Sequence, residues 1–265
     1  MNRISKAFEK EKTFIAFVTG GDPALETTES LIPKMAEAGA DIIEIGIPFS
    51  DPIAEGVVIQ EADVRALKAG TTTDQLFDMV ARVREKTQVP LVFMTYMNPV
   101  YTYGTERFMQ RCAQVGIDGV IIPDVPFEER EEVSDACKAA GVTLISMIAP
   151  TSKERIHMIA REAKGFLYCV SSLGVTGVRS KITTDIHAMV EQVKQVSDVP
   201  CAIGFGIATP EQAYEMAKTA DGVIVGSAIV KLIAQYGRKS VEPVCNYILA
   251  MKKAVRNAEI ETRIS

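Results

Sequence analysis

The sequence predicts an α/β fold, a closed (β/α)8 TIM barrel with a short helix before the first strand. Three observations favour this fold. The chain has 265 residues, close to the roughly 250 that eight β/α units need. Short β-rich runs alternate with amphipathic helical patterns along the whole chain. No GxGxxG turn follows the first strand candidate, which disfavours an open doubly wound sheet. We expect residues 1–265 to form a single domain.

The first twelve residues, MNRISKAFEKEK, alternate charges with single apolar side chains and predict a short amphipathic helix rather than a secretory signal. Eight later runs are rich in Val, Ile, Leu, Phe and Ala, as in parallel strands buried on both faces. These predicted strands cover residues 14–18, 41–46, 90–94, 119–123, 143–148, 165–170, 201–205 and 222–225.

Helical patterns lie between the strands. In residues 129–141, 153–165 and 183–197, apolar side chains recur at spacings of three and four, with charges on the opposite side. Gly39 and Gly141 each end a helical pattern directly before the next strand, which is typical of left-handed C-caps. Periodicity alone leaves the doubly wound sheet open as an alternative.

Composition excludes several classes of protein. A net charge of −5 without a basic cluster argues against a nucleic-acid surface. The longest apolar runs, such as residues 222–230, are too short to cross a bilayer. The cysteines are far apart and form no CxxC pair, which indicates reduced thiols and a cytoplasmic location; they are Cys112, Cys137, Cys169, Cys201 and Cys245.

In such a barrel the reactive groups lie at the carboxyl ends of the strands, and there the second strand stands out. Glu44 lies within a run of isoleucines, where an unpaired carboxylate is costly. Desolvation would raise its pKa and suit it to general acid/base work. The alternative is a structural glutamate satisfied by a nearby arginine or backbone amide.

The next loop, PFSDPIAEG, carries Asp51 and Glu55 between prolines and a glycine. These two residues are candidates for a second acid, but composition alone fits a rigid surface loop with solvated acids equally well.

Glycines mark the last two strands. GFGI at residues 204–207 and GVIVGSAIV at residues 222–230 place glycines at strand ends before helix starts, where barrels commonly bind phosphate. Ser227 adds a hydroxyl donor. A further loop, SSLGVTGVRS at residues 171–180, could close over substrate as a lid. The plainer alternatives are tight turns for the glycines and an ordinary mobile loop.

Seven motifs occur in order along nearly the whole chain: FVTGGDP, EIGIPFSDPIAEG, IIPDVP, MIAPTS, SSLGVTG, GFGI and VGSAIV. In this order they resemble the tryptophan synthase α subunit. The resemblance implies a carbon–carbon lyase of tryptophan biosynthesis, which cleaves indole-3-glycerol phosphate into indole and glyceraldehyde 3-phosphate by a retro-aldol reaction.

The resemblance also implies roles for individual residues. Glu44 matches the general acid/base that protonates indole C3. Glu55 matches the carboxylate that stabilises the positive charge on the indole nitrogen or takes its proton. Tyr168 matches a site tyrosine. The remaining matches line the indole pocket (Phe17, Tyr96), order the second acid (Thr176) and bind phosphate (Gly177, Gly206, Gly226, Ser227).

Two departures from the family pattern stand out. The usual loop reads DPLADGP, whereas this chain has Glu55 in place of aspartate and Val57 in place of proline. The extra methylene moves the carboxylate by roughly 1 Å, a displacement that can cost on the order of 10²-fold in rate. In the sixth-strand loop, Ser172 and Leu173 replace the common arginine and serine, which we expect to alter loop closure.

Family members pair with a β subunit that carries pyridoxal phosphate, so the resemblance implies an αββα assembly and no cofactor in this chain. Asp51, residues 98–104 and the IPDVP segment would supply the interface. Two alternatives remain: a weakly active barrel that binds ligand and regulates a β subunit, and a lyase that releases indole without a partner. Turnover of the isolated chain, and its increase with the partner, would discriminate between them.

Two other chemistries are disfavoured. No predicted strand carries a buried lysine for a Schiff base. The two histidines, His157 and His187, fall in helical stretches outside the barrel mouth without a second ligand at helical spacing, so no metal site is expected.

Overall fold

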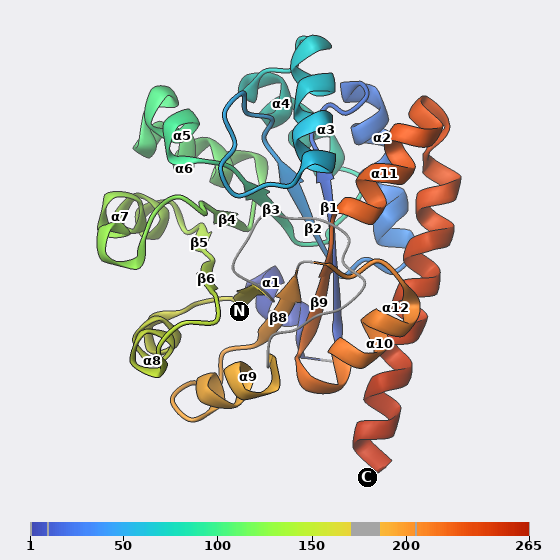
Figure 1. The fold of residues 1–265 in the computed structure, drawn as a ribbon. Coiled ribbons are helices and arrows are strands. Elements are labelled where there is room, and N and C mark those ends of the chain that lie inside the picture. The colour runs from blue at the N-terminus through green and yellow to red at the C-terminus, as the bar shows by residue number, and fades with distance from the viewer. Residues whose placement is uncertain (1, 10, 171–185, 205, 265) are drawn as a thin grey trace.

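The computed structural model describes residues 2–9, 11–170, 186–204 and 206–264. Parallel strands form the centre of the molecule, and helices surround them (Figure 1). The sheet has the order β5-β4-β3-β2-β1-β9-β8-β7-β6. The strands are β1 (Thr13–Thr19), β2 (Ile42–Gly46), β3 (Leu91–Met94), β4 (Gly119–Ile121), β5 (Thr143–Leu144), β6 (Ser146–Ile148), β7 (Leu167–Val170), β8 (Cys201–Gly204) and β9 (Gly222–Val225).

The predicted fifth strand is divided, which corrects the expectation of one continuous run. β5 pairs with β4, and β6 pairs with β7. Ile145 separates them and still donates its N–H to the Val120 carbonyl at 2.9 Å. At this residue the chain stops pairing with β4 and begins pairing with β7. The covalent link through Ile145 therefore connects the two ends of the nearly closed sheet. With β5 and β6 counted as one unit, the eight predicted units are present.

The other observed strands begin and end within two residues of the predicted positions. Gly165, predicted to begin the sixth strand, has a φ of +72° and lies in a turn. Both predicted helix-terminal glycines have positive φ, +111° at Gly39 and +72° at Gly141.

Helices follow the strands as predicted. They are α1 (Arg3–Ala7), α2 (Leu25–Glu37), α3 (Val57–Lys68), α4 (Thr73–Arg84), α5 (Met97–Tyr103), α6 (Thr105–Val115), η1 (Phe127–Glu129), α7 (Glu131–Ala140), α8 (Lys153–Glu162), α9 (Ile186–Lys194), α10 (Pro210–Thr219), α11 (Ser227–Tyr236), η2 (Gly237–Lys239) and α12 (Val241–Ile264). Among the described helices, none is long and apolar enough to span a membrane.

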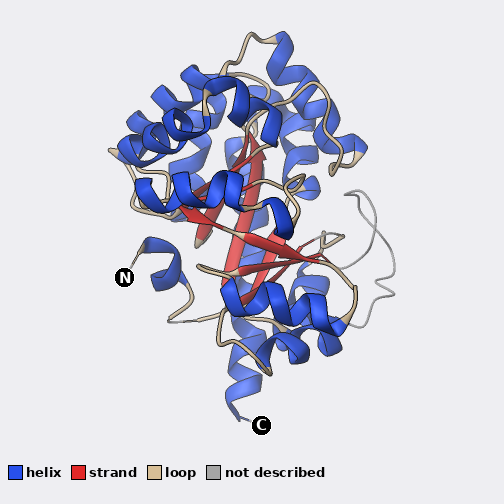
Figure 2. Cartoon of the chain, turned by 90° about the vertical axis from the view of Figure 1, so that its left-hand side faces the viewer, coloured by secondary structure: helices blue, strands red, loops and turns tan. Residues whose placement is uncertain are grey.

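Side chains alternate between two apolar layers, because successive strand residues point to opposite faces. One layer lies between the strands and the helices, and the other fills the barrel. The predicted N-terminal helix, α1, lies at one end of the barrel (Figure 2). Its Ile4 is fully buried in the interior cluster together with Phe166. The amino-terminal end of the barrel is therefore closed, and chemistry is left to the other end.

Three aspartates connect neighbouring strands at this closed end. Each comes directly before a strand and accepts the backbone N–H of a residue on the strand beside it. The pairs are Asp41 with Phe14 at 2.7 Å, Asp118 with Leu91 at 2.9 Å and Asp221 with Cys201 at 2.8 Å.

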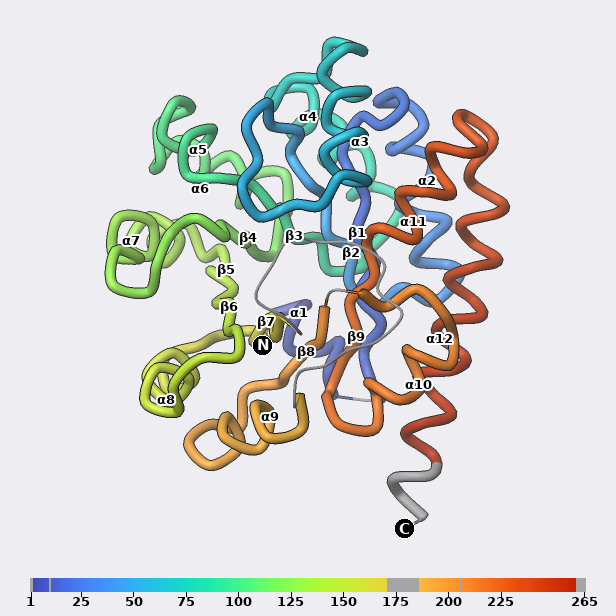
Figure 3. Tube along the Cα trace, in the orientation of Figure 1, coloured from blue at the N-terminus to red at the C-terminus, as the bar shows by residue number. Residues whose placement is uncertain are grey.

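The long helix α12 lies beside α10 and α2 (Figure 3). Its Lys252 is buried and reaches Asp41 at 2.7 Å and Glu11 at 3.3 Å. This contact ties the C-terminal helix to the start of β2.

Candidate active site

Glu44 lies on β2 with its side chain in the barrel interior. It is in register with Phe17 on β1 and Val92 on β3, both of which belong to the interior cluster. The residue is 0% exposed, and neither carboxylate oxygen has a hydrogen-bond partner among the described residues. Burial raises the pKa of Glu44 to about 8. Among the described residues, no arginine or backbone amide satisfies Glu44 as the structural alternative would require.

Two aromatic rings share this interior with Glu44. Tyr168 on β7 is buried, and its pKa is raised first by burial and then by the charge of Glu44, which places the two groups within electrostatic reach. A Cβ atom at Gly204 would lie 2.6 Å from the Tyr168 ring, so glycine is needed there for the ring to pack. Phe17 packs in the same way against Gly46 and Gly226.

Glu55 and Tyr96 form a second group in the loop after β2. The Tyr96 hydroxyl accepts the Ala54 N–H at 3.1 Å and also contacts the Glu55 carboxyl. Its ring lies 5.4 Å from that of Phe49. Glu55 is only 5% exposed, and burial raises its pKa. It is not the solvated surface acid that composition alone allowed.

Asp63 on α3 joins this group, although the sequence did not predict it. Its carboxyl is 3% exposed and contacts that of Glu55. Burial, followed by the Glu55 charge, raises the pKa of Asp63 to about 9. A signal was present, because Asp63 falls on the buried stripe of α3 with Ile59, Ala62 and Ala66, where an apolar residue is the norm.

The predicted phosphate site lies at the start of α11. Gly226 is the N-cap of this helix and Ser227 its first residue, and no side chain of the described residues caps the helix. Its first N–H groups therefore point toward any bound anion. The neighbouring helix α10 differs, because Thr209 and Gln212 form a capping box there. Gly206, with a φ of +81°, lies in the turn before α10.

Four predicted positions cannot be placed. Thr176 and Gly177, together with Ser172 and Leu173, lie outside the described residues. The lid and its share of the phosphate site stay predictions.

The family model described as tryptophan synthase alpha chain matches residues 4–258. The tryptophan synthase alpha chains of Lacticaseibacillus casei and Geobacter sp. strain M21 are each 46% identical to this chain and cover 96% of it, with 96% and 98% of their own lengths aligned. The chain belongs to the tryptophan synthase alpha chain family. It therefore acts as a carbon–carbon lyase of tryptophan biosynthesis, which cleaves indole-3-glycerol phosphate into indole and glyceraldehyde 3-phosphate.

Solved structures agree with this assignment. Tryptophan synthase subunit alpha from Legionella pneumophila strain Paris has a TM-score of 0.88 and 38% identity, covering 97% of this chain and 99% of its own. A chain of the tryptophan synthase complex from Pyrococcus furiosus has a TM-score of 0.84 and 33% identity. The match covers 91% of this chain and 98% of that one.

Schiff-base and metal chemistry would draw on the lysines and histidines of this tryptophan synthase alpha chain. The lysine buried there is Lys252 on α12, outside the barrel. His157 lies on α8, and His187 lies on α9 beside Glu191 at 3.5 Å. No group of three or more potential metal ligands occurs among the residues that the structure describes.

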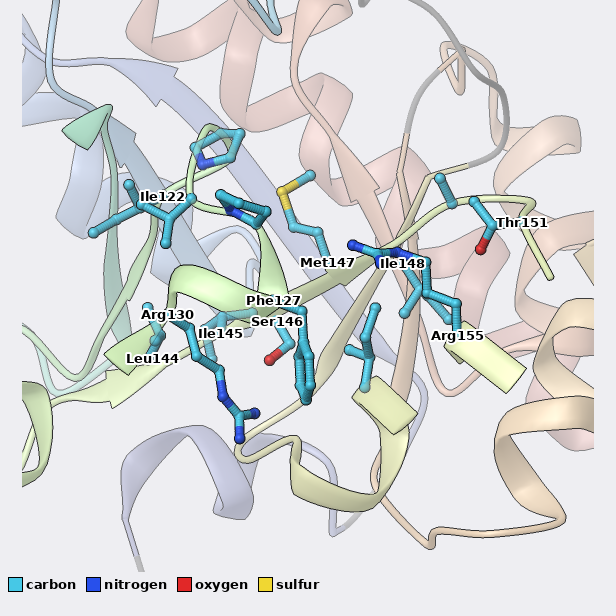
Figure 4. A pocket seen from close by; sticks show the side chains of 15 residues that line it. Ile122, Phe127, Arg130, Leu144, Ile145, Ser146, Met147, Ile148, Thr151 and Arg155 are labelled. Atoms are coloured by element: carbon cyan, nitrogen blue, oxygen red, sulfur yellow. The ribbon is translucent and has the colours of Figure 1, made fainter. Parts of the chain in front are cut away.

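A separate cavity of about 220 Å³ lies beside the interruption between β5 and β6, next to η1 and α8 (Figure 4). No acid lines it. Its two arginines, Arg130 and Arg155, are paired with Glu162 and Glu128. It therefore offers neither a proton donor for the alpha reaction nor an unpaired cation for the substrate phosphate.

Proposed function

We propose that Glu44 is the general acid/base of the lyase reaction and that Glu55 is the second carboxylate. One observation carries the assignment: Glu44 is a fully buried acid without a partner among the described residues, inside the barrel beside Phe17 and Tyr168. With a pKa of about 8, it holds its proton at neutral pH. General acids work best when their pKa lies near the operating pH.

The reaction needs one proton in and one proton out. Protonated Glu44 gives its proton to C3 of the indole ring, which makes the ring cationic. The electron pair of the carbon–carbon bond then returns to the ring and releases indole. The adjoining hydroxyl becomes the aldehyde of glyceraldehyde 3-phosphate and loses its proton to the Glu44 carboxylate, which restores the acid.

Glu55 stabilises the cationic intermediate through its negative charge near the indole nitrogen, a preorganised electrostatic interaction. Phe17 and Tyr96 line the indole pocket, and Tyr168 lies beside the proton donor. Glycines Gly177, Gly206 and Gly226 and the Ser227 hydroxyl bind the phosphate at the open start of α11. Support for the phosphate site comes from the absence of a side-chain cap on α11.

A β subunit is the proposed partner, in an αββα assembly in which that subunit carries pyridoxal phosphate. Large apolar side chains are exposed in or next to two of the predicted interface segments: Ile53 in the loop after β2 is 71% exposed, Val57 at the start of α3 67% and Tyr101 on α5 75%. Exposed apolar patches of this kind mark interaction surfaces. We place this assembly in the cytoplasm, in keeping with five free cysteines.

Indole release from indole-3-glycerol phosphate tests the assignment. Glu44→Gln should lower kcat by about 10³-fold, and Glu55→Gln by about 10²-fold or more, within the usual range for acid–base and electrostatic groups. A β subunit should raise the rate of the unmodified chain.

Other outcomes would support the alternatives. Ligand binding without turnover, with or without the β subunit, would support the regulatory reading. Full activity that the partner leaves unchanged would support a free-standing lyase. Wild-type turnover in Glu44→Gln would refute the role of Glu44.

A further inference from the structure

Two buried carboxyl groups meet where the β2 loop joins α3. Glu55 and Asp63 contact each other. One oxygen of each, Glu55 Oε2 and Asp63 Oδ2, has no hydrogen-bond partner among the described residues. Arg65, two residues further along α3, is bidentate on Asp22 at 2.7 and 2.8 Å. The nearby guanidinium is thus committed to another carboxylate.

Two carboxylates in contact in a buried setting do not both ionise, so the pair retains one proton near neutrality. Burial and the neighbouring Glu55 charge raise the pKa of Asp63 to about 9, and Asp22 adds to the rise. For Glu55, burial raises the pKa, but the hydrogen bonds from Asp63 and Tyr96 oppose that rise. The pair therefore carries one negative charge and one proton, and the Tyr96 hydroxyl is a further hydrogen-bond donor on the Glu55 side.

We infer that Asp63 is a positioning residue, which keeps its carboxyl protonated and donates a hydrogen bond that holds the Glu55 carboxylate in place. This inference rests on the proposed role of Glu55 as the second carboxylate. It deepens that role by identifying the group that orients Glu55 and leaves it charged.

The surroundings make Asp63 a rigid donor. Its carboxyl also accepts the backbone N–H of Phe49 from the β2 loop. The Arg65–Asp22 pair anchors the same turn of α3 to the loop after β1. Tyr96 contacts Glu55 from the β3 side. Glu55 is thus held by two donors on separate elements, which compensates for the extra freedom of a side chain one methylene longer than aspartate.

Infrared difference spectroscopy tests the shared proton without reference to activity. At neutral pH, Glu44→Gln should retain the band of a protonated carboxyl group, and the double variant Glu44→Gln/Asp63→Asn should lose it. Asp135→Asn in the Glu44→Gln background is the matched control, because Asp135 is exposed on α7. Identical spectra for the double variant and this control would overturn the inference.

The kinetics of Asp63 variants test whether Asp63 positions the Glu55 carboxylate. Asp63→Leu, of similar size but without a donor, should lower kcat for indole release by about 10- to 100-fold, with KM changed less than about threefold. Asp63→Asn should recover most of that loss, because its amide donates to Glu55 and its carbonyl still accepts the Phe49 N–H.

Equal kcat in Asp63→Leu and the unmodified chain would overturn the inference. Equal loss in Asp63→Leu and Asp63→Asn, with both variants folded by circular dichroism, would also overturn it. Failure of the proposed function shows separately, as undiminished turnover in Glu55→Gln while the infrared result stands.

Discussion

Glu44 carries a cost for stability that follows from its function. The folded chain keeps a proton on this fully buried carboxyl up to a pKa of about 8, whereas the ordinary value is 4.5. Between these two pH values the unfolded chain releases a proton that the folded chain retains, so Glu44 lowers stability as pH rises through this window. Below the window both states are protonated and the effect vanishes.

Glu44→Gln should therefore stabilise the protein while sharply lowering kcat. At neutral pH we expect the free energy of unfolding in urea to rise by about 2 kcal/mol. This is less than the full pKa shift of Glu44 implies, because the protein around a buried charge relaxes and reduces its cost. The gain in stability should shrink toward zero as the pH falls to the ordinary glutamate pKa of 4.5. A gain of equal size at acidic and neutral pH would contradict this explanation.

The sequence predicted some site residues and not others. Glu44 was identifiable because a charged residue interrupts a buried strand near its carboxyl end, and the structure places it in the interior. Asp63 was not, because its meaning depends on contact with Glu55, eight positions earlier in the sequence. The spacing of apolar residues along a helix predicts which side chains are buried, but it does not predict which polar side chains contact each other.

At the scale of elements, the closed end of the barrel relies on aspartates that precede strands. Asp118 is the best connected: it binds the Leu91 N–H at 2.9 Å, Arg84 at 3.0 Å and Arg3 at 3.0 Å. One side chain thereby joins β3, β4, α4 and α1. The repeated aspartate before a strand is visible in the sequence, but its partners emerge only when parallel strands are placed in register.

Asp118→Ala should lower the free energy of unfolding by about 3 kcal/mol, because it leaves the buried Leu91 N–H without its acceptor and the half-buried Arg84 without its carboxylate partner. Urea unfolding measures the change. Asp135→Ala, on the exposed face of α7, should change it by less than about 0.5 kcal/mol. Equal effects in the two variants would show that the aspartate contacts contribute little.

Across the whole molecule, the sequence predicted the barrel because the strand and helix periods differ and alternate without interruption. It did not predict the break at Ile145, since barrel closure is a property of the ring of strands and not of any one segment. The exposure of Ile53 and Tyr101 belongs to this scale too, because the sequence alone does not show that both side chains lie on the surface.

Tyr101→Ser should weaken binding of a β subunit by about tenfold or more, as expected for loss of an exposed aromatic anchor at an interface. Isothermal titration calorimetry measures the dissociation constant. Leu249→Ser on α12, where the side chain is 61% exposed, is the matched control and should leave affinity unchanged. Equal affinity for all three proteins would place the interface elsewhere.

The central claim is that Glu44 supplies a proton near neutral pH, and the pH dependence of kcat for indole release tests it most directly. Because Glu44 must be protonated, kcat should fall tenfold per unit above a pH of about 8, whereas any fall on the acid side belongs to protonation of Glu55. In Glu44→Gln the limb near pH 8 should be absent from whatever activity remains. A rate that stays level through that pH, or a Glu44→Gln variant with the same limb and rate, would contradict the account.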